Sequence, residues 1–469
     1  MEETHAGSSL EGLLLDILGQ AERINRLYTQ LTLCFPVGNE SPGLRAEVIE
    51  NLERGLARLC RTFPWLAGKV VQDGGEFKIT STASAPHLVV KELQGHGPVP
   101  SWDELNRANF PFRMLDEDAI SPCRTMVEPG AERPVLIIQA NFVQGGLLLT
   151  FNAQHGGMDM TGQGQVIALF AKACRGEDFT EDELEVGNMK RTRWIPISDD
   201  DAPDHPEASR PGGEQNVRPL ASDSNSRGGF SGPQQPRSGS LVWAYLEFPA
   251  ASLANLKQLG SETLNTSDAT FVSTDDVLTA LTWQLMTRAR QPGLNSQQST
   301  KTTLTRNVDI RSHFGLPSTY PGLMTTSTIH EHTVDDVEHK PLGAVASSLR
   351  AALRPALLRE SAKAQASIIA RCKESAAQMS VAARSNRRLD VKVSSWAREK
   401  LYDLDFGPCL GRPKAVRRPK FGDGAREGLV YFLPRERDGS IVVGVCLREE
   451  DMDRLREDEE ARRWASWIG

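Results

Sequence analysis

Hydrophobic and polar residues follow one another along the first part of the chain in patterns that predict both strands and helices. Residues 28–35 alternate apolar and polar side chains, which is typical of a half-buried strand. Residues 44–61 carry apolar side chains at helical spacing, and residues 166–173 do so again. Two apolar runs, 135–143 and 147–154, are joined through glycine and predict a β-hairpin.

The second part of the chain shows the same mixture of patterns. The segment 271–290 predicts a helix with Ser273 or Thr274 as its cap, and two aspartates follow where negative charge is favourable. Strands are further predicted at 241–248, 428–434 and 440–447. Helices are predicted at 252–259 and in the acidic C-terminal end, and residues 342–380 are helical in composition. Both parts therefore predict a mixed α/β fold, and the hairpins argue against a purely parallel sheet.

A stretch rich in Pro, Gly, Ser and Asp separates the two parts. Residues 196–240 hold few apolar side chains, so burying them would not offset the entropy lost when the segment becomes ordered. We therefore expect a long exposed linker. The linker divides the chain into an N-terminal domain, residues 1–195, and a C-terminal domain, residues 241–469.

Composition and charge narrow the class of protein. The chain has 469 residues, with 54 Lys and Arg against 61 Asp and Glu, which gives a net charge of −7. This balance excludes the domain-wide basic field typical of nucleic-acid binding. No apolar run approaches the ~18 residues of a membrane span, and the chain start lacks the order of a signal peptide. The seven cysteines follow neither a disulfide nor a zinc pattern. We therefore expect a cytoplasmic protein with reduced thiols, bound to neither nucleic acid nor membrane.

Three of the nine histidines, His330, His332 and His339, lie in one acidic stretch. Imidazole and carboxylate groups are good metal ligands, so a metal site is one interpretation of this stretch. The histidine spacing matches no fixed ligand pattern, however, and we favour a solvated loop and expect no bound metal.

His155 differs from the other histidines because an apolar strand ends at it. Gly156 and Gly157 follow it directly, and Asp159 lies four residues on. Strand ends that open into loops often hold catalytic groups, and glycines there allow close approach to the ring. With an unperturbed pKa of about 6.5, a neutral imidazole can accept a proton from a hydroxyl near pH 7. Alone, the string HxxxD is weak, since it occurs by chance in many chains.

A second string, Asp405-Phe406-Gly407, lies in the last third of the chain. In this order, HGGMD and DFG resemble the motifs of the BAHD acyltransferases, which carry HxxxD in mid-chain and DFGWG near the C-terminus. A closer resemblance, to the fungal branch related to trichothecene 3-O-acetyltransferase, rests on the segments LDILGQ, LYTQLTLCFP, FPWLAGKV, STDDVLTALTWQ and RNVDIRSHFGLP. It spans almost the whole chain outside the linker. The chain departs from the family pattern at DFGPC, which replaces DFGWG, and at Met160, where members often have glycine.

The resemblance implies two chloramphenicol-acetyltransferase-like domains with mixed sheets, joined by a long crossover. A piece at about residues 405–425 would cross back and complete the sheet of the first domain. A channel would run between the domains with His155 at its middle. Acetyl-CoA or another acyl-CoA would enter as co-substrate from one face and a small-molecule alcohol from the other, with no permanently bound cofactor. One chain supplies both walls of this channel, so we expect a monomer.

The resemblance also implies roles for single residues. His155 would be the general base. For Asp159, chemistry alone suggests that it orients His155, as in a catalytic triad. The resemblance instead directs the carboxylate of Asp159 toward Arg311, which supports the site, and we follow the resemblance. Asp405 and Gly407 would shape a loop near the coenzyme.

Coenzyme binding is assigned to Lys257, Ser273 and Thr274. A helix N-terminus offers free N–H groups and a favourable dipole to phosphate, and lysine adds positive charge. Simple helix capping next to an exposed lysine explains the same residues equally well.

These expectations combine into a coenzyme-A-dependent O-acyltransferase that acetylates a hydroxyl of a fungal secondary metabolite. Two alternatives stay open. The altered DFGPC string allows a non-catalytic binding protein of the same fold. A condensation-type catalyst acting on carrier-protein thioesters is a third interpretation, but Gln154 and Met160 replace its usual histidine and glycine, and the acidic net charge does not favour carrier docking.

Overall fold

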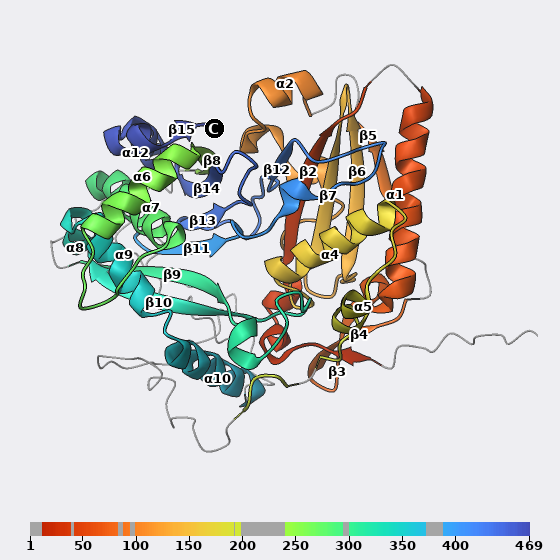
Figure 1. Cartoon of the computed structure of the whole chain (residues 1–469), viewed down its shortest axis with the longest axis horizontal. Coiled ribbons are helices and arrows are strands. Elements are labelled where there is room, and N and C mark those ends of the chain that lie inside the picture. Colours follow the sequence, from red (N-terminus) through yellow and green to blue (C-terminus); the bar gives the residue numbers. More distant parts are fainter. Residues whose placement is uncertain are drawn as a thin grey trace, which may run out of the picture.

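The computed structural model describes residues 12–38, 42–82, 88–93, 99–191, 193–197, 240–293, 300–371 and 388–469. These residues form two halves that lie side by side, one from the first part of the chain and one from the second (Figure 1). The predicted linker, 196–240, falls almost entirely outside the described residues.

The first half is built on a five-stranded sheet with strand order β12-β2-β7-β6-β5, beside a small sheet of order β1-β4-β3. Its strands are β1 (Leu13–Leu14), β2 (Tyr28–Pro36), β3 (Lys69–Asp73), β4 (Glu76–Thr80), β5 (Val89–Glu92), β6 (Leu136–Val143), β7 (Gly146–Gln154) and, from late in the chain, β12 (Ala415–Arg417). Its helices are α1 (Pro42–Thr62), α2 (Trp102–Arg107), α3 (Glu117–Ile120), α4 (Met160–Cys174) and α5 (Glu181–Gly187). The strand predicted at 28–35 and the hairpin predicted at 135–154 are confirmed as β2 and as the antiparallel pair β6–β7.

The second half is built on a seven-stranded sheet with strand order β10-β9-β11-β13-β14-β8-β15. Its strands are β8 (Leu241–Phe248), β9 (Lys301–Asp309), β10 (Thr325–Thr333), β11 (Val391–Ser395), β13 (Leu429–Phe432), β14 (Ile441–Arg448) and β15 (Ser466–Trp467). Its helices are α6 (Ala250–Glu262), α7 (Thr274–Arg290), α8 (Val334–His339), α9 (Leu342–Ala351), α10 (Pro355–Arg371), α11 (Glu449–Glu457) and α12 (Glu459–Trp464). Both larger sheets contain parallel and antiparallel pairs, so the fold is α/β with mixed sheets, as predicted.

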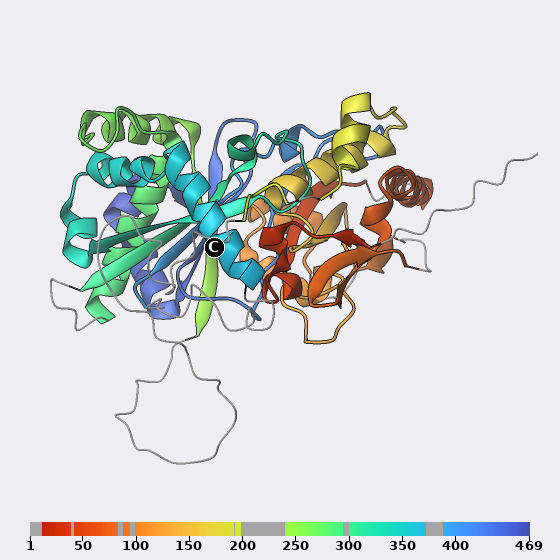
Figure 2. The same cartoon turned by 90° about the horizontal axis from the view of Figure 1, so that it is seen from below.

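Each large sheet buries one face under its own helices. In the first half, α1 and α4 cover the face on which Leu31 and Phe151 lie, and the apolar stripe of α1 is buried there. In the second half, α6, α7, α9 and α11 cover the face that carries Val391 and Val393. Figure 2 shows α1 nearly end-on at the outer side of its half. Burial of each large apolar side chain contributes roughly 1.5–3 kcal/mol, so these layers fix the two sheets in place.

The helical composition of residues 342–380 is confirmed for 342–371, whereas 372–380 lie outside the described residues. This part forms two helices, α9 and α10, because Pro355 disfavours helical backbone at the residue before it and starts a new helix instead. One expectation from the sequence needs correction. The solvated loop predicted around His330 is wrong, since this residue lies in β10 with only 7% of its surface exposed. Its ring contacts the hydroxyl of Thr328 at 3.0 Å. Among the described residues, no group of three or more potential ligands could hold a metal ion.

The segment after the DFG string belongs spatially to the first half. β12 pairs with β2 in antiparallel register and adds an edge strand to the five-stranded sheet (Figure 1). Just before it, the fully buried ring of Phe406 packs edge-on against Phe35 at 5.2 Å and Phe170 at 6.1 Å. The two halves are therefore joined by a covalent crossing as well as by packing. In the described part of the chain, no helix has the length and hydropathy that crossing a bilayer requires.

Phe406→Ala is expected to lower the free energy of unfolding by about 3–5 kcal/mol, because it leaves a cavity between two rings of the first half. Urea unfolding followed by tryptophan fluorescence measures the change. Phe271→Ala is the matched control, since Phe271 is 59% exposed, and it should cost less than about 1 kcal/mol. Equal losses in the two variants would contradict a packing role for Phe406.

Candidate active site

The HGGMD string forms the tight connection between β7 and α4. β7 ends at Gln154, and α4 begins at Met160 with Asp159 as its N-cap. The backbone N–H of His155 donates to the carbonyl of Leu27 at 2.9 Å, which ties the loop to the start of β2. His155 therefore stands where a rigid strand meets a helix N-terminus.

The first glycine after His155 is required by the side chain that packs against it. A Cβ on Gly156 would lie 2.2 Å from Oδ1 of Asn25, which cannot move freely because its amide donates to the carbonyl of Gly19 at 2.6 Å. The N–H of Gly157 donates to Oε1 of Gln154 at 2.7 Å. The sequence predicted that glycine allows close approach to the imidazole, whereas at Gly156 the approaching group is the Asn25 side chain.

Hydrogen bonds at Nδ1 determine the protonation pattern of the His155 ring. Nδ1 lies 3.3 Å from the carbonyl oxygen of Met158 and 3.3 Å from the hydroxyl of Thr29. Because a carbonyl oxygen only accepts, the proton of the neutral ring sits on Nδ1 and leaves the lone pair on Nε2. Burial lowers the pKa of His155 below its ordinary value, so the ring is neutral at pH 7.

Asp159 does not contact His155 in the way a triad carboxylate would. Its two oxygens accept from the Arg311 guanidinium at 2.7 and 3.0 Å. They also accept from the N–H of Gly162 at 3.0 Å, the N–H of Met324 at 2.9 Å and the hydroxyl of Thr325 at 2.8 Å. Although burial opposes ionisation, Arg311 and these donors hold the pKa of Asp159 below its ordinary range. The carboxylate thus joins the start of α4 to the second half of the chain.

A second buried network supports the same loop and was missed from the sequence. The Arg191 guanidinium donates to the carbonyl of Gly157 and stacks on the Trp65 ring at 4.7 Å. It lies 3.7 Å from the carboxylate of Asp16, which accepts from the hydroxyl of Tyr320 at 2.7 Å. The only signal for this network was the resemblance of LDILGQ, which contains Asp16, to the fungal branch.

Glu399 adds an acidic group at the start of α4 that the sequence did not single out. The hydroxyl of Thr161 donates to its carboxylate at 2.9 Å. Burial raises the pKa of Glu399 to about 7, and the negative charge of Asp159 contributes. A Cβ on Gly164 would lie 2.4 Å from the Glu399 carboxylate, so glycine at this position gives it room.

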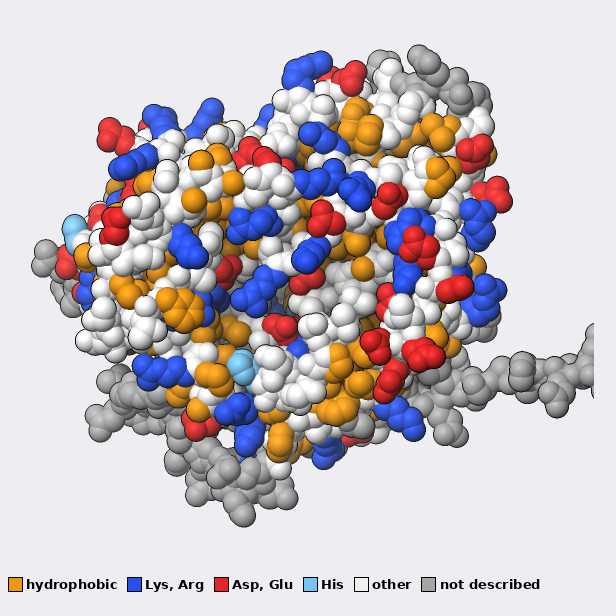
Figure 3. Space-filling view, viewed as in Figure 1, with side chains coloured by type: hydrophobic (Ala, Val, Ile, Leu, Met, Phe, Trp, Pro, Cys, Tyr) orange, Lys and Arg blue, Asp and Glu red, His pale blue; other side chains and the backbone are white. Residues whose placement is uncertain are grey.

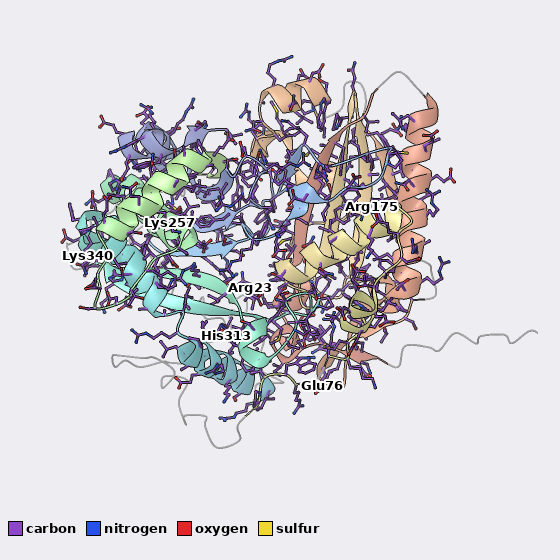
Figure 4. All side chains as sticks on the ribbon, in the orientation of Figure 1. Arg23, Glu76, Arg175, Lys257, His313 and Lys340 are labelled. Carbon is purple, nitrogen blue, oxygen red and sulfur yellow. The ribbon has the colours of Figure 1, made fainter. Side chains whose placement is uncertain are left out.

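The structure does not bring the DFG string to His155. Asp405 accepts from the N–H of Gly407 at 2.8 Å, and Gly407 adopts a φ of +93° that favours glycine. Arg175, which follows α4, donates to the carbonyl of Asp405. Figure 4 shows Arg175 at the end of α4 farthest from the junction of the two halves. With a rise of 1.5 Å per residue, α4 separates the DFG turn from His155 by roughly 20 Å.

The three residues assigned to the coenzyme lie at the starts and faces of helices in the second half. Ser273 caps α7: its hydroxyl accepts from the N–H of Asp276 at 3.2 Å, and the Asp276 carboxylate accepts in return. Thr274 is the first residue of α7, and Lys257 is exposed on α6 (Figure 4). Helix capping explains the presence of Ser273 at this position. The binding of coenzyme by Lys257, Ser273 and Thr274 stays a prediction.

Two mixed sheets joined by a crossing strand, with His155 where the halves meet, make up the fold of this chain. Vinorine synthase shares this fold over 99% of the chain and 96% of its own, with a TM-score of 0.65 at 16% identity. Residues 27–174 match the model of the trichothecene 3-O-acetyltransferase-like N-terminal domain. An O-acetyltransferase of Cryptosporiopsis sp., dmxR13, is 41% identical over 97% of each chain. The protein belongs to the trichothecene 3-O-acetyltransferase-like family of fungal acyltransferases.

Solved relatives extend the same comparison to bound molecules. The trichothecene 3-O-acetyltransferase of Fusarium sporotrichioides is 38% identical over 97% of both chains. The structure of the F. sporotrichioides enzyme with coenzyme A and T-2 superposes with a TM-score of 0.84 over 98% of this chain. The structure from F. graminearum, with coenzyme A and deoxynivalenol, gives 0.87 at 34% identity over 98% of this chain and 100% of that one.

Asp159→Asn is expected to lower the free energy of unfolding at pH 7 by about 3–5 kcal/mol, because it leaves the buried Arg311 without its counter-charge. The folded-state pKa of Asp159 lies below its unfolded value, so the stabilisation is complete above about pH 4 and is lost as pH falls through the folded value. The difference between wild type and variant should therefore shrink only in strong acid. Urea unfolding at pH 7 and at pH 3 measures both differences.

Asp178→Asn is the matched control for the loss of an ion pair. Asp178 accepts from Arg58 at 2.8 Å, but its side chain is fully exposed. Its replacement should cost less than about 1 kcal/mol. If the free energy of unfolding of the Asp159→Asn protein equals that of this control protein, the buried ion pair does not hold the loop.

Proposed function

We propose that this protein transfers an acetyl group from acetyl-CoA to a hydroxyl of a fungal secondary metabolite, with His155 as general base. The observation that carries the proposal is a neutral, half-buried imidazole whose proton is held at Nδ1 by the carbonyl of Met158. Its Nε2 lone pair is therefore the free acceptor. The names of the relatives, O-acetyltransferases over nearly the whole chain, support acetyl transfer.

In the proposed reaction, Nε2 of His155 removes the acceptor hydroxyl proton as the oxygen attacks the thioester carbonyl carbon. The C–O bond forms, and the carbonyl electron pair moves onto oxygen in a tetrahedral intermediate. When the intermediate collapses, the C–S bond breaks and the imidazolium returns its proton to the departing thiolate. The products are the ester and free coenzyme A. A positioned general base of this kind contributes typically ~10²–10⁴ in rate.

Direct attack agrees with the state of four of the six described cysteines. Burial raises the pKa values of the thiols of Cys34, Cys60, Cys174 and Cys446 to about 12. A thiol with such a pKa is almost fully protonated near pH 7 and is a poor nucleophile. We therefore propose no acyl-enzyme, and acetyl-CoA acts as a co-substrate without a permanently bound cofactor.

The proposal includes a monomeric, cytoplasmic enzyme. One chain supplies His155 from the first half and Arg311 from the second, so the site needs no second copy. The alternatives of a binding protein and of a condensation-type catalyst find less support, because the residues that hold His155 in a base-competent state are all in place. Turnover with free acetyl-CoA separates these alternatives from the acetyltransferase.

His155→Ala is expected to lower kcat by about 10²–10⁴, since the acceptor proton then has no base. The assay follows free thiol released from acetyl-CoA in the presence of hydroxylated terpenoid, alkaloid and polyketide acceptors, with folding checked by circular dichroism. His339→Ala is the control, because that side chain is 67% exposed. Because the pKa of His155 is lowered, the acid limb of the wild-type kcat/KM profile should lie below pH 6.5. Full activity in the folded His155→Ala protein would falsify the mechanism.

Lys257→Met is expected to raise the KM for acetyl-CoA several-fold with kcat unchanged, because an exposed lysine that meets phosphate contributes to binding alone. A separate variant, Ser273→Ala, should also raise this KM and should in addition lower the free energy of unfolding by about 1 kcal/mol, because the helix cap is missing. Initial rates against acetyl-CoA concentration and urea unfolding separate the two effects. An unchanged KM in both variants would leave these residues with capping and surface roles only.

A further inference from the structure

Thr29 places a hydroxyl beside Nδ1 of His155, the ring nitrogen that does not accept the substrate proton. The hydroxyl oxygen lies 3.3 Å from Nδ1, the same distance as the carbonyl oxygen of Met158. The Thr29 side chain is buried, and among the described residues its hydroxyl has no other hydrogen-bond partner. A buried hydroxyl whose one partner is the proposed base points to a task at that base.

The backbone of Thr29 is held in place by a strand and by a helix. Thr29 lies opposite Ala153 in the β2–β7 pair, one residue before β7 ends at Gln154. Its carbonyl accepts from the buried amide of Gln163 in α4 at 3.2 Å. A β-branched side chain has few allowed χ1 rotamers, so a fixed backbone also restricts the hydroxyl. The contact between Thr29 and His155 is therefore built into the framework of the first half.

The two oxygens at Nδ1 accept one proton together. The carbonyl of Met158 can only accept, so the neutral ring carries its proton on Nδ1, and Thr29 accepts the same proton in a three-centre hydrogen bond. When Nε2 takes up a second proton, the ring becomes an imidazolium and Nδ1–H becomes a stronger donor. Each of the two hydrogen bonds therefore stabilises the protonated ring more than the neutral one.

The charges around His155 make this direct stabilisation important. Asp159 favours the protonated ring, whereas Lys392 and Arg418 oppose it, and burial opposes it most. Figure 3 shows Lys and Arg side chains gathered at the middle of one face, where the two halves meet. The Asp159 carboxylate binds Arg311 instead of the ring. The neutral oxygens at Nδ1 are therefore the groups that contact the protonated base directly.

Resting on the proposed function, we propose that Thr29 is a positioning residue for the acetyl transfer. Its hydroxyl accepts from Nδ1–H of His155, keeps Nε2 as the free acceptor and stabilises the imidazolium that forms when the substrate hydroxyl loses its proton. Nδ1 keeps its own proton throughout, and Thr29 neither gains nor loses one. In a catalytic triad a carboxylate has this task, whereas here a strand supplies an uncharged oxygen.

Thr29→Val keeps the shape of the side chain and removes the hydroxyl. It should lower kcat by about tenfold, because a hydrogen bond to a charged ring is lost, and leave the KM for acetyl-CoA nearly unchanged. The assay follows free thiol released from acetyl-CoA with the hydroxylated acceptor that the wild type turns over fastest. Thr29→Ser, which keeps the hydroxyl, should retain most of the activity.

Thr32→Val is the matched control for the loss of a buried hydroxyl. Thr32 lies in the same strand, but its hydroxyl contacts that of Thr150 at 2.9 Å instead of a histidine. Any loss of stability in this variant should leave kcat of the folded protein unchanged. A tenfold loss of kcat in Thr32→Val as well would assign the effect in Thr29→Val to the strand and overturn the inference.

The pKa of His155 gives a readout that a purely structural role would not change. The hydrogen bond from Nδ1–H favours the protonated ring, so its loss in Thr29→Val should lower the pKa of His155 further. The acid limb of kcat/KM should therefore move to lower pH. Nuclear magnetic resonance of protein with isotopically labelled histidine measures the same pKa without turnover, and His155→Ala identifies the signal. The wild-type spectra should also show the neutral ring with its proton on Nδ1.

A double variant tests whether Thr29 acts through His155. In the His155→Ala protein, adding Thr29→Val should change the residual rate by less than about twofold, because the two residues act as a unit. A further large loss would overturn the inference. So would an unchanged pKa of His155 in Thr29→Val, which decides the question even if no acceptor is turned over. Wild-type kcat in Thr29→Val beside an inactive His155→Ala would leave the proposed function standing and remove Thr29 from it.

Discussion

The buried pair between Asp159 and Arg311 is the contact on which the candidate active site depends. Asp159 caps the helix that follows the His155 loop, so its position fixes where α4 begins and where His155 stands. Arg311 comes from the other half of the chain and also donates to the carbonyls of Tyr320 and Gly322. One ion pair therefore sets the loop of one sheet against the other sheet. Burying this ion pair costs desolvation energy, and the hydrogen bonds that both oxygens of the Asp159 carboxylate accept offset that cost.

This arrangement gives the motif aspartate a structural task. A triad carboxylate would hydrogen-bond the imidazole and stabilise the imidazolium directly. Here the backbone carbonyl of Met158 holds the tautomer, whereas Asp159 binds Arg311 and favours the protonated ring only through its charge. One contact, with the carbonyl of Met158, orients the His155 ring, and another, between Asp159 and Arg311, places the loop. The second contact forms only when the two halves of the chain are packed together. β12, which inserts the second half into the first sheet, supplies that alignment covalently.

The sequence carried most of the fold and part of the site. Alternation and helical spacing predicted β2, the β6–β7 hairpin and α7, because in these segments one face is buried and the other is not. The helical composition at 342–380 did not show where Pro355 divides it into two helices. The pattern failed around His330, whose strand is short on apolar residues and polar on both faces. Arg191 and Glu399 escaped notice because their contacts are with residues distant in sequence, and no local period records such contacts.

The electrostatics of the base point in one direction. Burial and two neighbouring cations keep His155 neutral, so the ring is available as a proton acceptor but weak as one. Burial has the largest effect, Lys392 and Arg418 are the two cations, and the negative charge of Asp159 opposes them by favouring the protonated ring. Asp159 caps α4 in the first half, whereas Lys392 lies in β11 of the second half. The basicity of His155 therefore depends on charges from both halves, and it is set only when the two halves are packed together.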